Sequence, residues 1–293
     1  MTGAKELTAR LGGRWYGNYG TAPCPVCQPD GRQDQTGLTL TDGSDKLLAH
    51  CKRSGCGFTS IMAATGLSRG RWVPPDPAKS AQREAERRAN RARRAAQAKR
   101  FWDEAQPVDS SPAAFYLRGR GITCSLPTSL RFHRETWHAA SALRLPALIA
   151  RVQGADAFAI HRTYLLPDGS AKANISPVKA MLGSTSGGAV RLSGGSSRLV
   201  VTEGIETGLS LLCGLLNDPA DVWATLSTSG MKALKLPDRP GRLMIATDGD
   251  APGKLACNSL AARATALGWD VSVLPAPDGK DWNDVLTEKW STT

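Results

Sequence analysis

Residues 198–275 alternate between short apolar runs and longer segments with a helical pattern. The apolar runs cover residues 198–202, 222–227, 242–248 and 270–275, and their length is typical of buried strands. Strands that alternate with helices form a parallel sheet with right-handed crossovers, and such sheets bind ligands at the carboxyl ends of their strands. The pattern therefore predicts an α/β domain with its site at that edge.

Upstream, two further regions differ in composition. Residues 107–194 have apolar runs separated by Gly and Pro turns, which predicts a mixed α+β subdomain. Residues 74–106 are rich in Ala and Arg, which are strong helix formers, and Pro107 follows. We expect one helix without a wide apolar face that could pack on a core. It is either a solvated spacer or a helix that contacts phosphates, and the two roles are compatible.

Residues 1–73 contain two pairs of cysteines, Cys24 with Cys27 and Cys51 with Cys56. Between the pairs, two strand-like segments flank the turn signal Asp-Gly-Ser, so a hairpin brings the pairs together. Four converging thiolates suit a closed, structural zinc site in a zinc-ribbon module. His50 is the alternative fourth ligand, but neighbouring side chains of a strand point to opposite faces, which favours Cys51.

Composition narrows the class of protein. No apolar run is long enough to span a membrane and the amino terminus lacks the apolar centre of a signal peptide, so we expect a cytoplasmic protein. The formal net charge of +11 favours a polyanionic partner, either nucleic acid or an anionic membrane surface, and of these we expect nucleic acid and no membrane. Seven cysteines, an odd number, argue against a disulfide framework and for a metal site plus a few buried thiols.

Acidic residues follow the first and third predicted strands of the α/β domain. Glu203 follows the first strand, and Asp248 and Asp250 follow the third. Carboxylates that converge without matching cations repel one another, and a divalent cation such as Mg²⁺ or Mn²⁺ removes that cost. Asp281, after the last strand, is expected near the same metal, whereas Asp284 either joins it or caps the following helix.

The segments VVTEGIETGLSL, MIATDGDAPG and GKDWNDVL resemble the Toprim domain that is shared by bacterial-type primases, type IA and type II topoisomerases and some nucleases. The resemblance covers about residues 195–290. It implies that Glu203, Asp248 and Asp250 are catalytic and bind Mg²⁺ or Mn²⁺, with Asp281 as a further metal ligand.

Two more parts resemble primases. AFYLRGRGI, AIHRTYLLPDG and VKAMLGSTSGGAVRL, within residues 114–192, are similar to the basic subdomain before Toprim in phage-borne and plasmid-borne primases. The cysteine module resembles the zinc-binding domain of the same enzymes. The resemblance assigns nucleotide and template binding to Arg118, Arg162 and Lys179. It implies four domains: 1–73 zinc-binding, 74–106 linker helix, 107–194 basic subdomain and 195–293 Toprim.

The function that the resemblance implies is DNA primase, a nucleotidyltransferase that joins ribonucleoside triphosphates on a single-stranded DNA template. The chain's four tyrosines lie in no domain large enough for a topoisomerase gate. A Toprim nuclease remains an alternative, because the same acids can activate water, and so does a non-catalytic protein that binds single-stranded nucleic acid. A replicative helicase is a further partner that a primase can have, but the sequence indicates no site for it.

Overall fold

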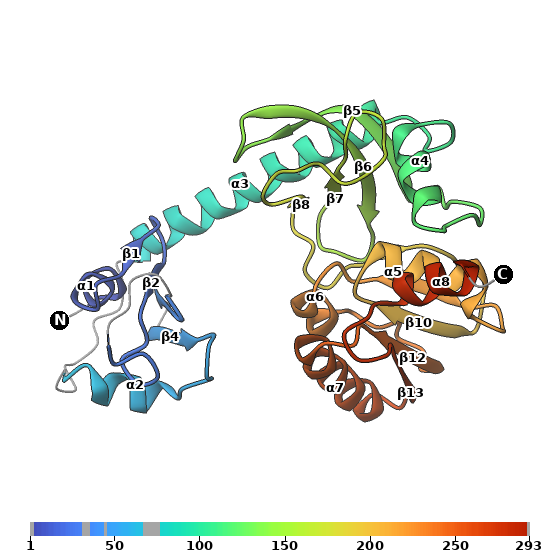
Figure 1. The fold of residues 1–293 in the computed structure, drawn as a ribbon. Coiled ribbons are helices and arrows are strands. Elements are labelled where there is room, and N and C mark those ends of the chain that lie inside the picture. Colours follow the sequence, from blue (N-terminus) through green and yellow to red (C-terminus); the bar gives the residue numbers. More distant parts are fainter. Residues whose placement is uncertain (1–2, 31–35, 44–45, 67–76, 292–293) are drawn as a thin grey trace. The chain divides into compact units, whose positions relative to one another are not determined.

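The computed structural model describes residues 3–30, 36–43, 46–66 and 77–291 (Figure 1). By its internal contacts the chain divides into two compact units, Met1–Arg88 and Ala89–Thr293. The domain boundary expected at residue 73 lies outside the described residues, and those at 106 and 194 stay predictions. None of the helices in these ranges combines the length and the apolar character needed to cross a membrane.

The amino-terminal unit is built on a small antiparallel sheet with the strand order β1-β2-β3-β4. The predicted hairpin is present, with Leu38 paired to Cys51 at its open end. Leu7, Leu40 and Ile61 form the centre of a small core beside the cysteines. The elements are α1 (Ala4–Arg10), β1 (Arg14–Trp15), β2 (Gly20–Ala22), β3 (Leu38–Asp42), β4 (Leu47–Cys51) and α2 (Phe58–Ala64).

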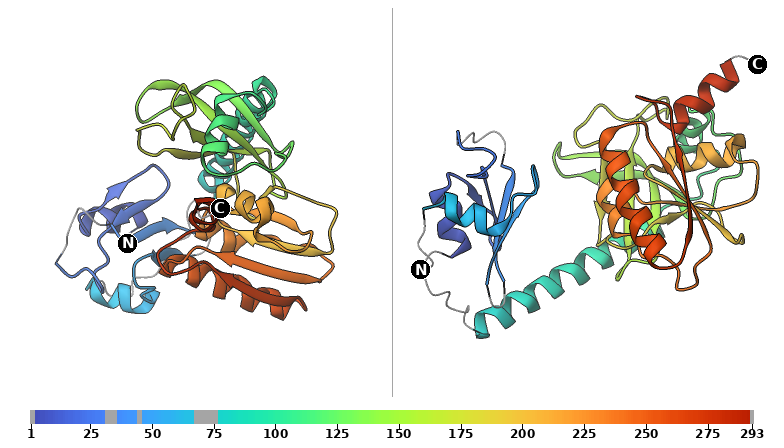
Figure 2. Two further views of the ribbon diagram at one scale, coloured as in Figure 1. Left: turned by 45° about the vertical axis from the view of Figure 1, so that its right-hand side comes forward. Right: turned by 90° about the horizontal axis from the view of Figure 1, so that it is seen from below.

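The Ala-rich and Arg-rich segment forms the single helix α3 (Pro77–Glu104), which ends before Pro107 as predicted. Residues 81–94 are exposed, as expected for a spacer. The last turns behave differently, because Ala98 and Trp102 are buried in a core with strands of the middle domain. The carboxyl-terminal part of α3 is therefore part of the second unit (Figure 2).

The middle domain is an antiparallel sheet in the order β5-β6-β7-β8. Alternate residues of β6 enter different cores: Ile149 packs toward α3, whereas Leu148 packs toward α4. Both faces of the sheet are thus covered. The elements are α4 (Pro112–Gly119), β5 (Leu130–His138), β6 (Leu143–Val152), β7 (Ala159–Tyr164) and β8 (Lys179–Leu182).

The carboxyl-terminal domain has the predicted α/β architecture. Its sheet has the order β13-β12-β10-β11-β9, in which the first four strands are parallel and β9 is antiparallel. The strands are β9 (Val190–Arg191), β10 (Arg198–Thr202), β11 (Asp221–Ala224), β12 (Arg242–Thr247) and β13 (Asp270–Pro275).

Helices cover both faces of this sheet (Figure 1). In β10, Val200 packs on the side of α5 and α8, whereas Leu199 and Val201 pack on the side of α6 and α7. This double burial explains why the strand is apolar throughout. The helices are α5 (Ile205–Ser210), continued by a π-helical turn at Leu211–Leu215, α6 (Thr228–Ala233), α7 (Ala251–Ala266) and α8 (Trp282–Ser291).

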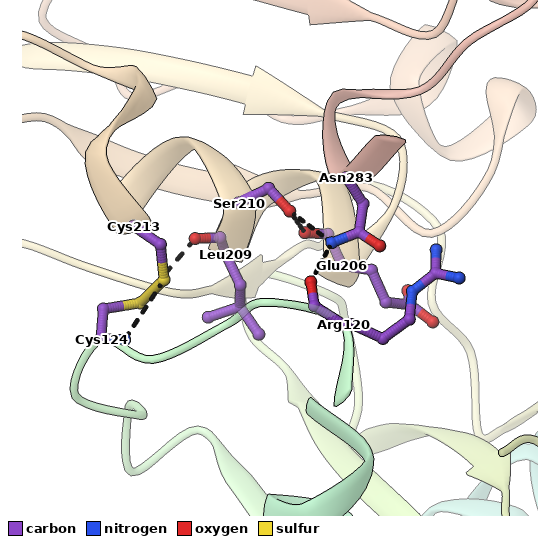
Figure 3. The surroundings of a disulfide bond; sticks show 7 residues. All are labelled: Arg120, Cys124, Glu206, Leu209, Ser210, Cys213 and Asn283. Atoms are coloured by element: carbon purple, nitrogen blue, oxygen red, sulfur yellow. Dashed lines mark hydrogen bonds between the residues drawn. A yellow bond between two sulfur atoms is a disulfide. The ribbon is translucent and has the colours of Figure 1, made fainter. Parts of the chain in front are cut away.

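The middle and carboxyl-terminal domains share one core, because Leu117 and Leu148 belong to the same buried cluster as Leu209. A disulfide between Cys124 and Cys213 also joins the two domains (Figure 3). The expectation that the cysteines outside the metal site are thiols is therefore wrong for this pair. The two cysteines are 89 residues apart in the sequence and are brought together by the shared core, so their spacing did not predict the pairing.

Candidate functional site

The first candidate site is the predicted cysteine cluster. The Sγ atoms of Cys24, Cys27, Cys51 and Cys56 all lie within 4.8 Å of one another, and those of Cys27 and Cys51 are 3.6 Å apart. A tetrahedral zinc with Zn–S bonds of about 2.3 Å places its sulfurs about 3.8 Å apart, so the cluster has the right size. His50 is exposed on the opposite face of β4 and is not part of the cluster, which confirms the four-cysteine prediction.

The pKa values of the cysteine thiols also favour a bound cation. Burial opposes the ionisation of Cys51, but the backbone N–H groups of Ser54, Cys56 and Arg53 outweigh it and lower the pKa of Cys51 to about 6. Burial and the neighbouring thiols raise the pKa of Cys56 to about 12. Without a metal, the four sulfurs therefore cannot all be thiolates at neutral pH, whereas a zinc ion would stabilise all four.

The second candidate site lies where β10 and β12 end. Glu203 follows β10 and Asp248 follows β12, and because these strands are parallel neighbours their carboxylates face one cavity of about 190 Å³. The cavity is lined by Arg120, Lys172, Lys179, Glu203, Gly204, Glu206, Thr207, Leu226, Asp248 and Asp281. The structure thus brings together three of the four acids that the sequence selected.

Asp281 reaches the cavity because its loop runs beside the Asp248 loop. The N–H of Gly249 donates to the carbonyl of Lys280 at 2.9 Å, and a Cβ on Gly249 would lie 2.2 Å from the carbonyl oxygen of Pro277. Only glycine permits this approach. Asp281 also caps α8, since its Oδ1 accepts hydrogen bonds from the N–H groups of Asn283 and Asp284.

Asp250 is placed differently from Asp248. It is the N-cap of α7, and its Oδ1 accepts a hydrogen bond of 2.7 Å from the N–H of Gly253. The residue is exposed and does not line the cavity. Its charge nevertheless acts on the site, because it contributes to the raised pKa values of Glu203 and Asp248.

The two central acids, Glu203 and Asp248, form no salt bridge with any lysine or arginine in the part of the chain that the structure describes. Burial, followed by the charges of Asp248 and Asp250, raises the pKa of Glu203. Burial, followed by the charge of Asp281, raises the pKa of Asp248 to about 6, although a hydrogen bond of 3.3 Å from the Thr207 hydroxyl opposes this. Carboxylates that are buried and close to other negative charges are stabilised by a divalent cation.

The acids are spaced for a hydrated ion. Among the described residues, only the four cysteines bring three or more metal-ligating groups within 4.8 Å of one another. Mg²⁺ commonly binds through one or two carboxylates and completes its shell with water and phosphate oxygens. Glu203 and Asp248, with Asp281 nearby, therefore fit Mg²⁺ or Mn²⁺ that also contacts a phosphate.

Cations from the middle domain line the same cavity. Lys179, which the sequence selected, is there, and so are Lys172 and Arg120, which it did not select. Arg118 lies two residues from Arg120 at the end of α4, but it is exposed and outside the lining. Arg118 lies in the last turn of α4, whereas Arg120 is the C-cap residue beyond the helix, and Arg120 is the one of the two that lines the cavity.

Arg162 lies on the other face of the middle sheet, toward α3. Its guanidinium donates to the carbonyl of Trp137 at 3.2 Å and stacks 5.7 Å from the ring centre of Tyr164. His161, the preceding residue, faces the cavity side, where burial and then the charge of Lys179 lower its pKa to about 4. Strand alternation therefore places Arg162 away from the acids.

Sequence reasoning missed Glu206, a buried acid in the first turn of α5. Its carboxylate forms ion pairs with Lys172 at 3.2 Å and Lys179 at 3.1 Å, and it accepts a hydrogen bond of 3.1 Å from Tyr116. A signal was available, because Glu206 is the one charged residue of α5, and a buried acid needs buried partners.

Two family models match successive segments of the second unit. Residues 198–291 match the model of the Toprim domain, and residues 92–192 match a model described as a domain of unknown function, DUF7146. The carboxyl-terminal domain is therefore a Toprim domain, as the sequence predicted. The comparison with curated proteins gave no match.

Three primase structures are similar to the chain. The zinc-binding and RNA polymerase domains of the Aquifex aeolicus primase match at 12% identity with a TM-score of 0.42, over 98% of this chain and 80% of that one. A DNA primase domain from Pseudomonas aeruginosa matches at 17% identity with a TM-score of 0.41, over 67% and 74%. The primase fragment of the bacteriophage T7 primase-helicase matches at 14% identity with a TM-score of 0.34, over 93% and 96%.

Proposed function

We propose that this chain is a DNA primase, which joins ribonucleoside triphosphates on a single-stranded DNA template by nucleotidyl transfer. One observation carries the proposal. Glu203 and Asp248 of the Toprim domain share a cavity with Lys172 and Lys179 of the preceding domain. Carboxylates that form no salt bridge among the described residues, with lysines in the same cavity, are what a site for a metal-bound triphosphate needs.

The acidic and the basic residues of the cavity have different proposed roles. Glu203 and Asp248 would hold a divalent ion, with Asp281 close enough to join them and Asp250 strengthening the negative field. When bound, that ion would neutralise phosphate charge and orient the reacting oxygens. Lys172, Lys179 and Arg120, which line the cavity, would donate N–H groups to the triphosphate.

Residues outside the cavity receive other roles. Arg118, exposed at the end of α4, is proposed to contact the template backbone. Arg162 is proposed to be structural, because its guanidinium is bonded to the carbonyl of Trp137 at the edge of the middle sheet. The zinc module and the exposed arginines of α3 are proposed to bind the template strand through its phosphates, since such contacts require cations and no particular sequence.

The direct test is incubation of the full chain with single-stranded DNA, labelled ribonucleoside triphosphates and Mg²⁺ or Mn²⁺, with products sized on a denaturing gel. A primase yields short labelled RNA that depends on both template and metal. Shortened DNA without labelled RNA would instead identify a Toprim nuclease, because the same acids can position water. A gel shift without either product would identify a non-catalytic nucleic-acid-binding protein. Deoxynucleotides in a parallel reaction establish the sugar preference.

A further inference from the structure

Glu206 is the most deeply buried acid beside the cavity, with 5% of its surface exposed. Its Oε1 accepts the Tyr116 hydroxyl and lies 3.2 Å from the ammonium of Lys172, while its Oε2 lies 3.1 Å from that of Lys179. Both carboxylate oxygens are thus engaged by the middle domain, although Glu206 belongs to the Toprim domain.

Glu206 differs electrostatically from the two central acids. Burial opposes its ionisation, but the charges of Lys179 and Lys172 outweigh burial, so its pKa lies well below the usual range. Glu203 and Asp248 have raised pKa values in the same cavity. Glu206 is therefore a fixed anion that already has its cations, and it is not a further metal ligand.

The two lysines are placed by different segments. Lys179 begins β8, and Lys172 lies beyond a turn in an isolated bridge with Leu165. Their side chains are 39% and 32% exposed, so each ammonium is accessible from the cavity. An ammonium has three N–H donors, and the bond to Glu206 leaves others for a ligand. Glu206 therefore brings two cations from separate segments to one wall of the cavity.

Glu206 is itself held firmly. Its carbonyl accepts a hydrogen bond from the Ser210 hydroxyl at 2.8 Å, and Ser210 accepts one from Asn283 at 2.9 Å. Asn283 also donates to the carbonyl of Arg120 at 2.7 Å, which connects α5 and α8 to the loop after α4. Figure 3 shows the Arg120 and Glu206 side chains extending to the same side of this network.

We propose that Glu206 is a positioning residue that directs the ammonium groups of Lys172 and Lys179 toward the polyphosphate of an incoming nucleotide. A long lysine side chain loses much rotamer freedom when it binds a phosphate, and a fixed carboxylate beneath both lysines removes part of that cost in advance. The inference rests on the proposed function for its nucleotide substrate, but its main test is binding and needs no catalysis.

The test is calorimetric titration of the full chain with ATP in the presence of Mg²⁺. Glu206→Gln retains the side-chain shape and the oxygen that accepts from Tyr116, but it releases both lysines. We expect its affinity for ATP to fall on the order of tenfold, the scale of one or two charge-assisted hydrogen bonds. Binding of Mn²⁺ alone should change less than about threefold, because Glu203 and Asp248 are not bonded to Glu206.

Three further variants separate positioning from packing. Asp156→Asn is the matched control, because Asp156 forms an exposed ion pair with Lys235 at 2.6 Å and should not alter ATP binding. Tyr116→Phe removes only the hydroxyl and should retain most of the affinity. Adding Glu206→Gln to a Lys172→Met, Lys179→Met chain should produce no further loss, because the lysines through which Glu206 acts are already gone.

If Glu206→Gln melts at the wild-type temperature but binds ATP as tightly as the wild type, the proposal is wrong. A loss of ATP affinity of equal size in Tyr116→Phe would also overturn it, because packing would then be responsible. If Glu206→Gln does not fold, Glu206→Asp replaces it: the charge stays but the carboxylate is withdrawn by one methylene, and ATP affinity should still fall.

Where primers are made, the Michaelis constant for nucleotides should rise in Glu206→Gln while kcat stays within about threefold, as expected for a residue that acts on binding. A fall in kcat with an unchanged Michaelis constant would contradict positioning. If the wild type makes no primers but binds ATP in the predicted manner, the proposed polymerisation fails and the role of Glu206 stands. The two failures are therefore distinguishable.

Discussion

Asp281 and Asp284 cap α8 reciprocally: the N–H of Asp284 donates to Oδ1 of Asp281 at 2.9 Å, and the N–H of Asp281 donates to Oδ2 of Asp284 at 3.0 Å. This capping-box arrangement settles the choice that the sequence left open, since both residues serve the helix end. Asp281 alone also lines the cavity. One carboxylate thus has a structural and an electrostatic role, which mutation can separate.

Asp281→Asn should retain the cap but remove the charge, because asparagine is as good an N-cap as aspartate. We expect an unchanged melting temperature and a higher Mg²⁺ requirement for nucleotide binding. Asp281→Ala removes both and should also lose about 1 kcal/mol of stability. Thermal melts and metal titrations of the two variants check this. Equal metal dependence in the wild type and Asp281→Asn would restrict Asp281 to the cap.

Asp248 should make the stability of the metal-free protein dependent on pH. Its folded-state pKa of about 6 exceeds the ordinary value of 3.8, so between these values the folded protein holds a proton that the unfolded chain has released. The contribution of this carboxyl group to the free energy of unfolding is therefore fully present below pH 3.8 and is lost as the pH rises through 6. In chemical denaturation with chelator, Asp248→Asn should lack this decline.

Mg²⁺ competes with that proton, so its addition should restore stability to the wild type above pH 6 and not to Asp248→Asn. A wild-type profile that matches the variant's at every pH would show that the carboxylate is not desolvated. The prediction concerns one carboxylate, and the comparison with its amide removes the contribution of other titrating groups.

The cysteine cluster should contain one zinc ion per chain. Cys24→Ser or Cys56→Ser should release the metal and unfold the small amino-terminal unit, whose core is too limited to be stable alone. His50→Ala is the matched control and should retain zinc, because His50 lies on the opposite face of β4. Metal analysis and proteolysis of residues 1–88 provide the measurements. Zinc-free wild type, purified without chelator, would contradict the assignment.

The disulfide between Cys124 and Cys213 should stabilise the second unit only under oxidising conditions. It closes a separation of 89 residues, for which chain entropy gives at most about 4 to 5 kcal/mol. Cys213→Ser should therefore melt below the wild type without reductant and together with it in dithiothreitol. Cys257→Ser, a free buried cysteine, should show no such dependence on reductant. Equal numbers of thiols in the unfolded, unreduced Cys213→Ser and Cys257→Ser variants would refute the crosslink, because with the disulfide the first variant has two thiols more than the second.

The sequence predicted the elements that are determined locally. The strand at Arg198–Thr202 is buried on both faces and therefore apolar, and the cysteine spacing with its turn signal defined the hairpin. Contacts between distant segments were not predictable in this way. Glu206 meets Lys172 and Lys179 only through the shared core, and the turn after α4 places Arg120, rather than Arg118, in the cavity. Asp250 and Asp248 are two residues apart, but the start of α7 turns Asp250 outward.

The proposed nucleotidyl transfer is tested most directly by primer synthesis with Glu203→Gln beside the wild type, with ATP binding measured on the same samples. The substitution retains the side-chain volume and removes a charge that faces the proposed metal. We predict that metal-dependent RNA product disappears while the melting temperature is maintained or slightly raised, since an unfavourably buried charge is gone. ATP should still bind through the lysines, but more weakly. RNA product at the wild-type level from folded Glu203→Gln would contradict the account, because the acid at the end of β10 would then have no part in the chemistry.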